Sequence, residues 1–255
     1  MRVLVIGDVI GRPGRKAVKG LLPGLRNQYN IDLVIANGEN AAGGVGITAD
    51  TTEELISAGI DVITTGNHVW AHKDIIPCLD SEMPILRPLN YPPGVPGRGY
   101  LVSRGAMVVN LMGRTFIGPL DCPFRGIDKL LAEVSPRPPV IIVDFHAEAT
   151  SEKMAMGRYL DGRVSAVLGT HTHVGTIDLQ VFPGGTAYVT DIGMTGPVHS
   201  VIGDRIELVL HRFLTGLHVP LSVGEGKTVL NAVMLDIDEG TGKAVAVQRI
   251  QRETD

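Results

Sequence analysis

The chain has 255 residues, of which 44% are hydrophobic and 20% charged, so it carries enough apolar material for a full core and dominant disorder is excluded. The formal net charge of −4 gives no global signature of a protein that binds long nucleic acids or membrane surfaces. Two cysteines, Cys78 and Cys122, are too few for a disulfide framework, so both are expected to be reduced thiols.

The apolar start "MRVLVIGDVI" does not predict a targeting segment. Gly7 and Asp8 interrupt it too early for the hydrophobic part of a signal peptide, and no later apolar run reaches membrane-spanning length. We therefore expect a cytoplasmic protein with no membrane partner.

Five short β-branched runs predict central strands whose ends carry small or polar residues. These runs are 2–8, 32–40, 61–68, 140–148 and 165–173. Between the first three lie amphipathic segments, 14–29 and 48–59, that predict crossover helices, with Thr48 or Asp50 as the cap of the second. Strand, helix, strand in this order predicts parallel βαβ units, which gather ligands at the carboxyl ends of their strands.

The later part of the chain predicts hairpins rather than further parallel units. Segments 179–194, 227–238 and 244–253 fit hairpin strands, with a helix over 204–214, and together they indicate a mixed second sheet. The Pro- and Gly-rich stretch 87–100 fits a long loop beside the site better than a linker. We expect a single domain over residues 1–255.

Polar side chains at five predicted strand ends favour a metal site. They are Asp8, Glu39, Asn40, Asn67, His68, His146, His171 and His173. In "VLGTHTH" (167–173) the two histidines leave one face if the strand stays extended. A lone histidine at a strand end is usually a core residue. Polar residues at the ends of five strands instead favour a shared functional site. Carboxylate, amide and imidazole donors without thiolates suit Mn²⁺, iron or Zn²⁺.

Charge counting favours an anionic substrate for such a site. Two divalent ions beside the carboxylates of Asp8 and Glu39 and neutral neighbours leave about two positive charges, or about one with a bridging hydroxide. A phosphoryl group would offset that charge. The donor set thus favours phosphoryl chemistry.

Six segments together carry a resemblance over essentially the whole chain. They are "GDVIGRPGR" (7–15), "NGENAAGG" (37–44), "TGNHVW" (65–70), "DFHAEATSEK" (144–153), "GTHTHVGT" (169–176) and "TDIGMTGP" (190–197). The combination resembles the YmdB-like family of calcineurin-like metallophosphoesterases. Two departures from the wider superfamily support this narrower branch: Ile10 stands where a D-x-H motif would place histidine, and Glu39 replaces a bridging aspartate.

The resemblance implies an α/β fold built as a four-layer α/β/β/α sandwich of two mixed β-sheets, the calcineurin-like metallophosphoesterase fold. It also implies two metal ions per chain, with iron or manganese ahead of zinc. The implied activity is phosphodiesterase hydrolysis of cyclic nucleotides or another small phosphodiester, with 2′,3′-cyclic nucleotides as the expected substrates.

The resemblance also implies roles for the strand-end residues. The first ion would be held by Asp8, Glu39, Asn40 and His173. The second would be held by Glu39, Asn67, His146 and His171, so that Glu39 bridges the pair. A metal-bridging hydroxide would attack the phosphodiester in line, and His68 would act as general acid on the leaving oxygen.

Other functions stay open at this point. A metal-bound regulatory module with little turnover is one, and a phosphomonoesterase or short-RNA exonuclease on the same core is another. A homo-oligomer, most often a two-fold dimer, is a further open expectation.

Several other polar residues are expected outside the set of metal ligands. Arg12, Arg114 and Arg125 are treated as solvated loop charges, although each could bind phosphate or base. His72 is expected on a solvent-facing helix, and Asp144 could orient a ligand. Of the later histidines, His199 is the one whose segment could close over the site. A structural cap is the expected role of Thr150 and Ser151.

Overall fold

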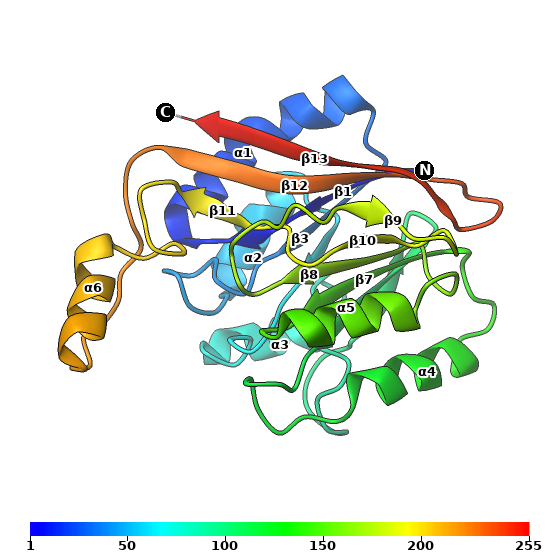
Figure 1. Ribbon diagram of the computed structural model, residues 1–255, viewed down its shortest axis with the longest axis horizontal. Coiled ribbons are helices and arrows are strands. Elements are labelled where there is room, and N and C mark those ends of the chain that lie inside the picture. Colours follow the sequence, from blue (N-terminus) through cyan, green and yellow to red (C-terminus); the bar gives the residue numbers. More distant parts are fainter. Residues whose placement is uncertain (255) are drawn as a thin grey trace.

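The computed structural model describes residues 1–254, in which two mixed β-sheets lie face to face with helices outside them (Figure 1). The first sheet has the order β2-β11-β12-β1-β3-β4, with β13 paired to β12. Its strands are β1 (Arg2–Ile6), β2 (Asp8–Val9), β3 (Leu33–Asn37), β4 (Val62–Thr64), β11 (Met194–Pro197), β12 (Thr228–Ile237) and β13 (Ala244–Thr254).

The second sheet has the order β5-β6-β7-β8-β10-β9. Its strands are β5 (Tyr100–Ser103), β6 (Ala106–Met112), β7 (Val140–His146), β8 (Ala166–Thr170), β9 (Gln180–Val181) and β10 (Ala187–Val189). The helices are α1 (Gly11–Tyr29), α2 (Ala49–Ser57), α3 (Ile76–Leu79), α4 (Pro123–Glu133), α5 (Thr150–Tyr159) and α6 (Ile206–Thr215), with a 3₁₀ turn η1 (Lys73–Ile75) before α3.

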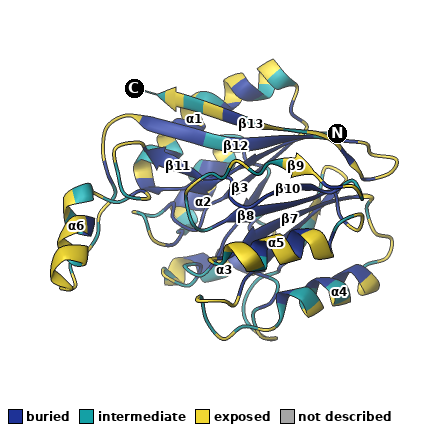
Figure 2. Ribbon diagram, viewed as in Figure 1, coloured by how far each residue is buried: buried dark blue, intermediate teal, exposed yellow. Residues whose placement is uncertain are grey.

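Three separate hydrophobic cores show that the molecule has four layers. Along β1, Leu4 and Ile6 pack against α1 and α2, whereas Val3 and Val5 pack against the second sheet. The third core joins the outer face of the second sheet to α4 and α5. The buried strands and the exposed outer faces of these helices are visible in Figure 2. The expected α/β/β/α arrangement of two mixed sheets is confirmed.

Parallel pairing brings the carboxyl ends of the central strands together. β1, β3 and β4 are parallel to one another, as are β6, β7, β8 and β10. The crossover helices form as predicted, although α1 begins at Gly11, three residues before the expected start. Thr48 caps α2 through a reciprocal hydrogen-bond pair with Thr51, so the first of the two predicted caps is the observed one.

Two local predictions about the later chain are wrong. The β12–β13 hairpin joins the first sheet, because β12 pairs antiparallel with β1 over Arg2↔Asp236 to Ile6↔Ala232. The second error concerns α5, whose N-cap is Ala149 with no side-chain hydrogen bond. Neither Thr150 nor Ser151 caps that helix.

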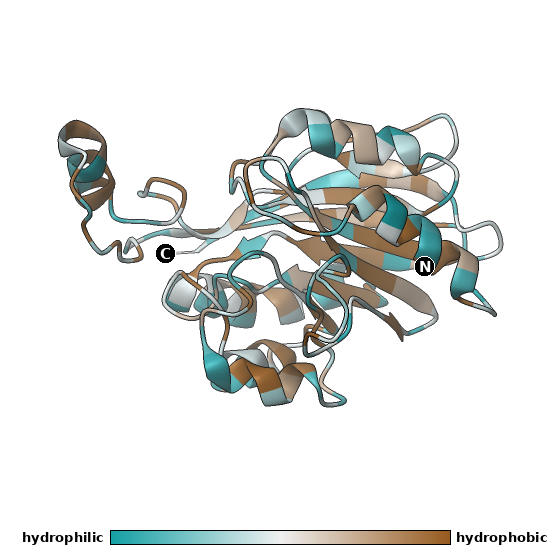
Figure 3. Ribbon diagram, turned by 90° about the horizontal axis from the view of Figure 1, so that it is seen from below, coloured by the Kyte–Doolittle hydropathy of each residue, from teal (hydrophilic) through white to brown (hydrophobic). Residues whose placement is uncertain are grey.

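Helix α6 forms close to the predicted 204–214 and projects from the body of the molecule (Figures 1 and 3). Val209 is its buried residue, whereas Phe213 and Leu214 are each 83% exposed. Within residues 1–254 no helix has the length and apolar character that crossing a membrane requires.

Candidate metal centre

The predicted side chains come from both sheets and meet at the carboxyl ends of the strands. From the first sheet, Asp8 lies in β2, Glu39 and Asn40 follow β3, and Asn67 and His68 follow β4. From the second sheet, His146 ends β7, and His171 and His173 follow β8. The site is therefore assembled from segments far apart in the sequence.

A first group of donor atoms surrounds His146 Nε2. Glu39 Oε1 lies 2.9 Å from it, and Asn67 Oδ1 and His171 Nδ1 each lie 3.0 Å away. One ring nitrogen can donate to no more than one of these three atoms. The separations match the ligand–ligand edges of about 2.8–3.4 Å that 2.0–2.1 Å metal bonds produce at octahedral or tetrahedral angles. Glu39, His146 and His171 together present donor atoms within 4.8 Å of one another.

A second group lies beside the first, around Asp8. Its carboxyl group is fully buried, and Oδ1 has no hydrogen-bond partner within residues 1–254. That oxygen lies 3.7 Å from His173 Nε2, which is 3.1 Å from Asn40 Nδ2. The same amide lies 3.4 Å from Glu39 Oε1, so one oxygen of Glu39 contacts both groups. A buried, unpartnered carboxylate oxygen is costly unless a cation meets it, so the residues fit a metal.

Hydrogen bonds to the outer nitrogens of two histidines leave their inner nitrogens facing the site. His171 Nε2 lies 2.9 Å from Glu148 Oε2, which leaves Nδ1 toward the first group. His173 Nδ1 donates to the Ile202 carbonyl at 2.6 Å, which leaves Nε2 toward Asp8. Metal-binding histidines commonly donate their second N–H to a carboxylate or carbonyl in this way.

His146 is oriented through an intervening hydroxyl. Thr170 Oγ1 donates to Asp144 Oδ1 at 2.7 Å, so it accepts from His146 Nδ1 at 2.9 Å. Thr64 also donates to the Asp144 carboxylate, which is buried. Asp144 thus orients His146 through Thr170 and not by direct contact.

The electrostatics of the site favour a cation. Burial raises the pKa of Glu39, but contact with His146 outweighs it and lowers that pKa to about 2. Burial would lower the pKa of His146, yet Glu39 and Asp8 raise it to about 9. Burial and His146 lower the pKa of His171 to about 3, and burial raises that of Asp8 to about 6. The negative potential that draws a proton to His146 is also one that binds metal ions.

The extended geometry expected for "THTH" is not observed. β8 ends at Thr170, and His171 and His173 have φ values of 97° and 65°. The strand-alternation argument for these histidines is therefore wrong, and the two rings reach different groups of donors. Thr172 anchors the turn, because its N–H and its hydroxyl donate to Asp191 Oδ2 at 3.2 and 2.7 Å.

Asp191 belongs to a buried ion pair that the sequence did not reveal as functional. Lys153 Nζ lies 2.8 Å from Asp191 Oδ2, with the side chains 1% and 0% exposed. Both residues lie in segments that carry the family resemblance, 144–153 and 190–197. Their pairing, however, depends on contact between α5 and the segment before β11.

His68 lies at the edge of the site. Its backbone N–H donates to Glu39 Oε2 at 3.1 Å, and the half-buried imidazole makes no hydrogen bond within the described chain. Gly66 permits this turn, since an added Cβ would lie 2.2 Å from His146 Nε2 and 2.4 Å from Glu39 Oε2.

Two of the other histidines lie away from the donor groups. The helix expected around His72 is not observed, because this residue precedes η1 in extended backbone, with Nε2 3.0 Å from the Val45 carbonyl. His199 is exposed, and its segment contributes the Ile202 carbonyl to the site instead.

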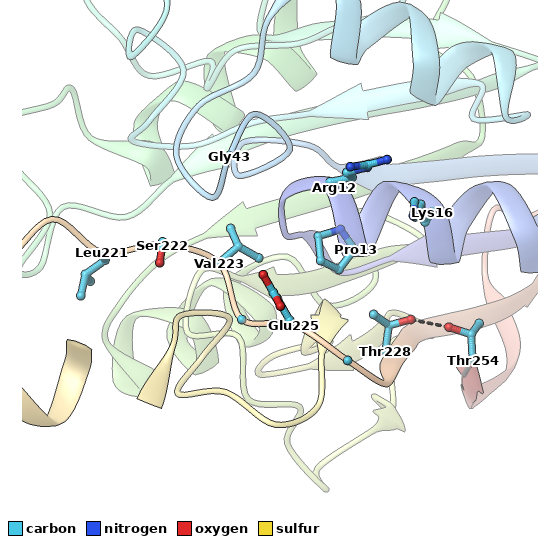
Figure 4. A pocket seen from close by; sticks show the side chains of 12 residues that line it. Arg12, Pro13, Lys16, Gly43, Leu221, Ser222, Val223, Glu225, Thr228 and Thr254 are labelled. Atoms are coloured by element: carbon cyan, nitrogen blue, oxygen red, sulfur yellow. Dashed lines mark hydrogen bonds between the residues drawn. The ribbon is translucent and has the colours of Figure 1, made fainter. Parts of the chain in front are cut away.

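Two cavities adjoin the segments that form the site. Arg12 and Lys16 of α1 line one of about 610 Å³, next to Gly43 and Val223 (Figure 4). Arg114 and Arg125 line the other, of about 1000 Å³.

Two mixed sheets between helices, with carboxylate, amide and imidazole donors at their strand ends, define a metallophosphoesterase type of protein. The family model for YmdB-like protein matches residues 4–250, and the chain belongs to that family.

Similar proteins share the full length of the chain. It is 51% identical to a 2′,3′-cyclic-nucleotide 2′-phosphodiesterase of Bacillus subtilis over 98% of this chain and 96% of that protein. A crystal structure of a hypothetical protein from Thermus thermophilus superposes with a TM-score of 0.94 at 50% identity, covering 100% of both chains. A phosphatase structure from Mycoplasma pneumoniae has a TM-score of 0.93 at 34% identity, covering 99% of this chain and 93% of that one.

Proposed function

We propose that the protein is a single-domain, metal-dependent phosphodiesterase that hydrolyses cyclic nucleotides, with 2′,3′-cyclic nucleotides as its substrates. The observation that carries this proposal is the convergence of two donor groups on one oxygen of Glu39, beside the unpartnered Asp8 oxygen. The 51% identity to the Bacillus subtilis 2′,3′-cyclic-nucleotide 2′-phosphodiesterase supports the substrate class.

Two ions would occupy the centre, with iron or manganese ahead of zinc, since the donors are oxygen and nitrogen atoms without thiolate. Asp8, Asn40 and His173 would hold one ion. Asn67, His146 and His171 would hold the other, with Glu39 between them. When bound, these ions would lower the pKa of water and offset charge on the phosphoryl oxygens.

The chain's own groups account for the remaining steps. The three histidines are held with one nitrogen toward the centre by Thr170, Glu148 and the Ile202 carbonyl. During hydrolysis the oxygen of water bonds to phosphorus and one bond from phosphorus to a ribose oxygen breaks. The protonated imidazole of His68 supplies the proton that this leaving oxygen takes up, and the proton lost by the attacking water balances it.

The test combines metal content with turnover for wild type and His68→Ala. Substrates are adenosine 2′,3′-cyclic phosphate, adenosine 3′,5′-cyclic phosphate and bis-p-nitrophenyl phosphate. We expect two metal equivalents in both proteins, preference for the 2′,3′-cyclic ester, and a kcat about 10²–10⁴-fold lower in the variant. His211→Ala, which changes an exposed histidine on α6, serves as the matched control.

Each other outcome contradicts a stated part of the proposal. Loss of an ion in His68→Ala would make His68 a ligand and not the acid. Two bound ions without turnover of any ester would reject the enzyme and favour a regulatory module.

A further inference from the structure

The larger cavity is a basic cleft between the loop at 87–100 and α4. We define the basic cleft by its five basic side chains, Arg87, Arg98, Arg114, Arg125 and Lys129. Two acidic side chains also line it, so basic groups prevail there in a chain whose formal net charge is −4. The local charge is thus opposite in sign to that of the whole molecule.

Three of the basic groups already have partners. The Arg87 guanidinium donates to backbone carbonyls, including that of Pro88 at 2.9 Å. Arg98 lies 4.0 Å from a carboxylate oxygen of Glu82, and Lys129 lies 3.9 Å from one of Glu133. These contacts reduce their capacity to hold a further anion.

Arg114 and Arg125 differ from the other three. Both side chains are exposed, and neither guanidinium makes an ion pair or hydrogen bond within residues 1–254. A guanidinium offers a planar set of donors that suits phosphate oxygens. The cleft therefore has two free phosphate-binding groups on different segments, the loop after β6 and the first turns of α4.

Two contacts connect the lining of the basic cleft with segments that carry the metal centre. Gly113 donates to the carbonyl of His146 at 2.9 Å, so Arg114 is the next residue after a direct neighbour of a proposed ligand. Tyr91 also lines the cleft, and its ring packs edge-on against that of Trp70, two residues after His68, with the ring centroids 5.4 Å apart. A ligand in the cleft would therefore have one end beside the centre.

The cleft is as large as the largest usual small-molecule sites. Its volume of about 1000 Å³ lies at the upper limit of about 300–1,000 Å³ usual for small-molecule sites. Tyr91 and Tyr100, two of the five tyrosines, line it and provide aromatic surface of the kind on which bases stack. Repeated cations and aromatic rings along one cleft suit a short nucleic-acid strand.

We propose that the basic cleft binds the 5′ side of a short oligoribonucleotide whose 3′ end carries the 2′,3′-cyclic phosphate. Arg114 and Arg125 pair with internal phosphodiesters, and the terminal cyclic ester reaches the metal centre. This inference rests on the proposed function and specifies its substrate: an RNA fragment is preferred to a free mononucleotide.

The test compares kcat/KM for adenosine 2′,3′-cyclic phosphate and for the trinucleotide ApApA ending in the same cyclic phosphate. In wild type we expect the trinucleotide to be favoured at least 10-fold. In R114Q/R125Q the ratio of the two kcat/KM values is expected to fall to about 1. The control R12Q/K16Q removes the same charge from the other cavity and should keep the wild-type ratio.

Salt provides a second measurement on the same proteins. Two phosphate contacts on a single strand predict that the wild-type preference falls about sevenfold between 50 and 200 mM KCl. The R114Q/R125Q ratio should not change with salt over this range.

The outcomes separate this inference from the proposed function. A wild-type ratio near 1, or a preference that survives in R114Q/R125Q, overturns the oligonucleotide cleft while mononucleotide turnover still supports the phosphodiesterase. If wild type hydrolyses neither ester, the proposed function fails. In that case, fluorescence anisotropy with a labelled ApApA 3′-phosphate tests oligonucleotide binding in the cleft. Binding at least 10-fold weaker in R114Q/R125Q than in wild type supports the inference, and equal binding overturns it.

Discussion

The hydrogen bond between His146 Nδ1 and Thr170 Oγ1 determines which nitrogen of that ring can meet a metal. Because Thr170 donates to Asp144, its oxygen accepts the Nδ1 proton of His146, and Nε2 is the ring nitrogen left to face the donor group. Thr170 is 1% exposed, so no solvent replaces it.

Thr170→Val should weaken metal binding without removing a ligand. We expect an affinity 10–100-fold lower, because the ring of His146 loses the group that fixes its tautomer and orientation. Competition with a chelator, followed by metal analysis, measures this change. Thr52→Val, at another buried threonine whose hydroxyl bonds only within α2 and its cap, is the matched control. Equal affinities in the two variants would show that Thr170 does not orient the ligand.

At the scale of single residues, the sequence predicted the polar strand ends but not their supports. Asp8, Glu39 and His146 stand out because each interrupts or follows an apolar run. Thr170 and Glu148 carry no such signal, since their roles depend on neighbours in space. A threonine in a strand and a glutamate after one are ordinary residues until the tertiary contacts are known.

At the scale of elements, the turn after β8 is held by contacts from two other segments. His171 and His173 adopt positive φ, which costs of order 1–3 kcal/mol per residue unless the surroundings enforce it. Asp191 accepts from both the N–H and the hydroxyl of Thr172, and Lys153 of α5 holds Asp191. The turn therefore depends on the packing of α5 against β8.

Asp191→Asn should be strongly destabilising. Lys153 would remain buried without its counter-charge, which typically costs about 3–5 kcal/mol in the free energy of unfolding. Denaturant unfolding monitored by circular dichroism measures the change. The control is Glu133→Gln, which breaks the exposed pair with Lys129 and should cost less than about 1 kcal/mol. A similar small loss for both variants would show that the buried pair does not stabilise the fold.

Local sequence patterns predicted most of the helices and strands, whereas they did not predict which strands pair with each other. The period of apolar residues predicted most of the strands and α1, α2 and α6 to within a few residues, but not β5, β6 or α4. The β12–β13 hairpin was assigned to the wrong sheet because its pairing with β1 joins residues more than 200 positions apart. Likewise, the positive φ of His171 could not be predicted, since histidine rarely adopts it without tertiary constraint.

At the scale of the whole molecule, the candidate metal centre lies where the two sheets meet. Asp8, Glu39 and Asn67 come from one sheet, and His146 and His171 come from the other. Metal ions bound at these side chains would cross-link the layers and would favour the folded chain over the unfolded one.

Removal of metal should therefore lower thermal stability. At a free metal concentration about 100 times the dissociation constant, one bound ion adds about 2.7 kcal/mol, which for a chain of this size corresponds to about 5–11 °C in Tm. Thermal unfolding with and without a chelator tests this. In Glu39→Gln the chelator should leave Tm unchanged, because the residue shared by both donor groups is altered. An unchanged Tm in the wild type would show that the ions do not stabilise the fold.

The division of the site between the sheets also affects how activity relates to folding. Neither sheet alone contains a complete group of donors, because Glu39 contacts His146 of the second sheet and Asn40 of the first. A chain in which only one sheet has formed thus offers an incomplete set of ligands. Catalysis would consequently require completed assembly: a half-folded copy would be inert and would have no uncontrolled phosphodiesterase activity.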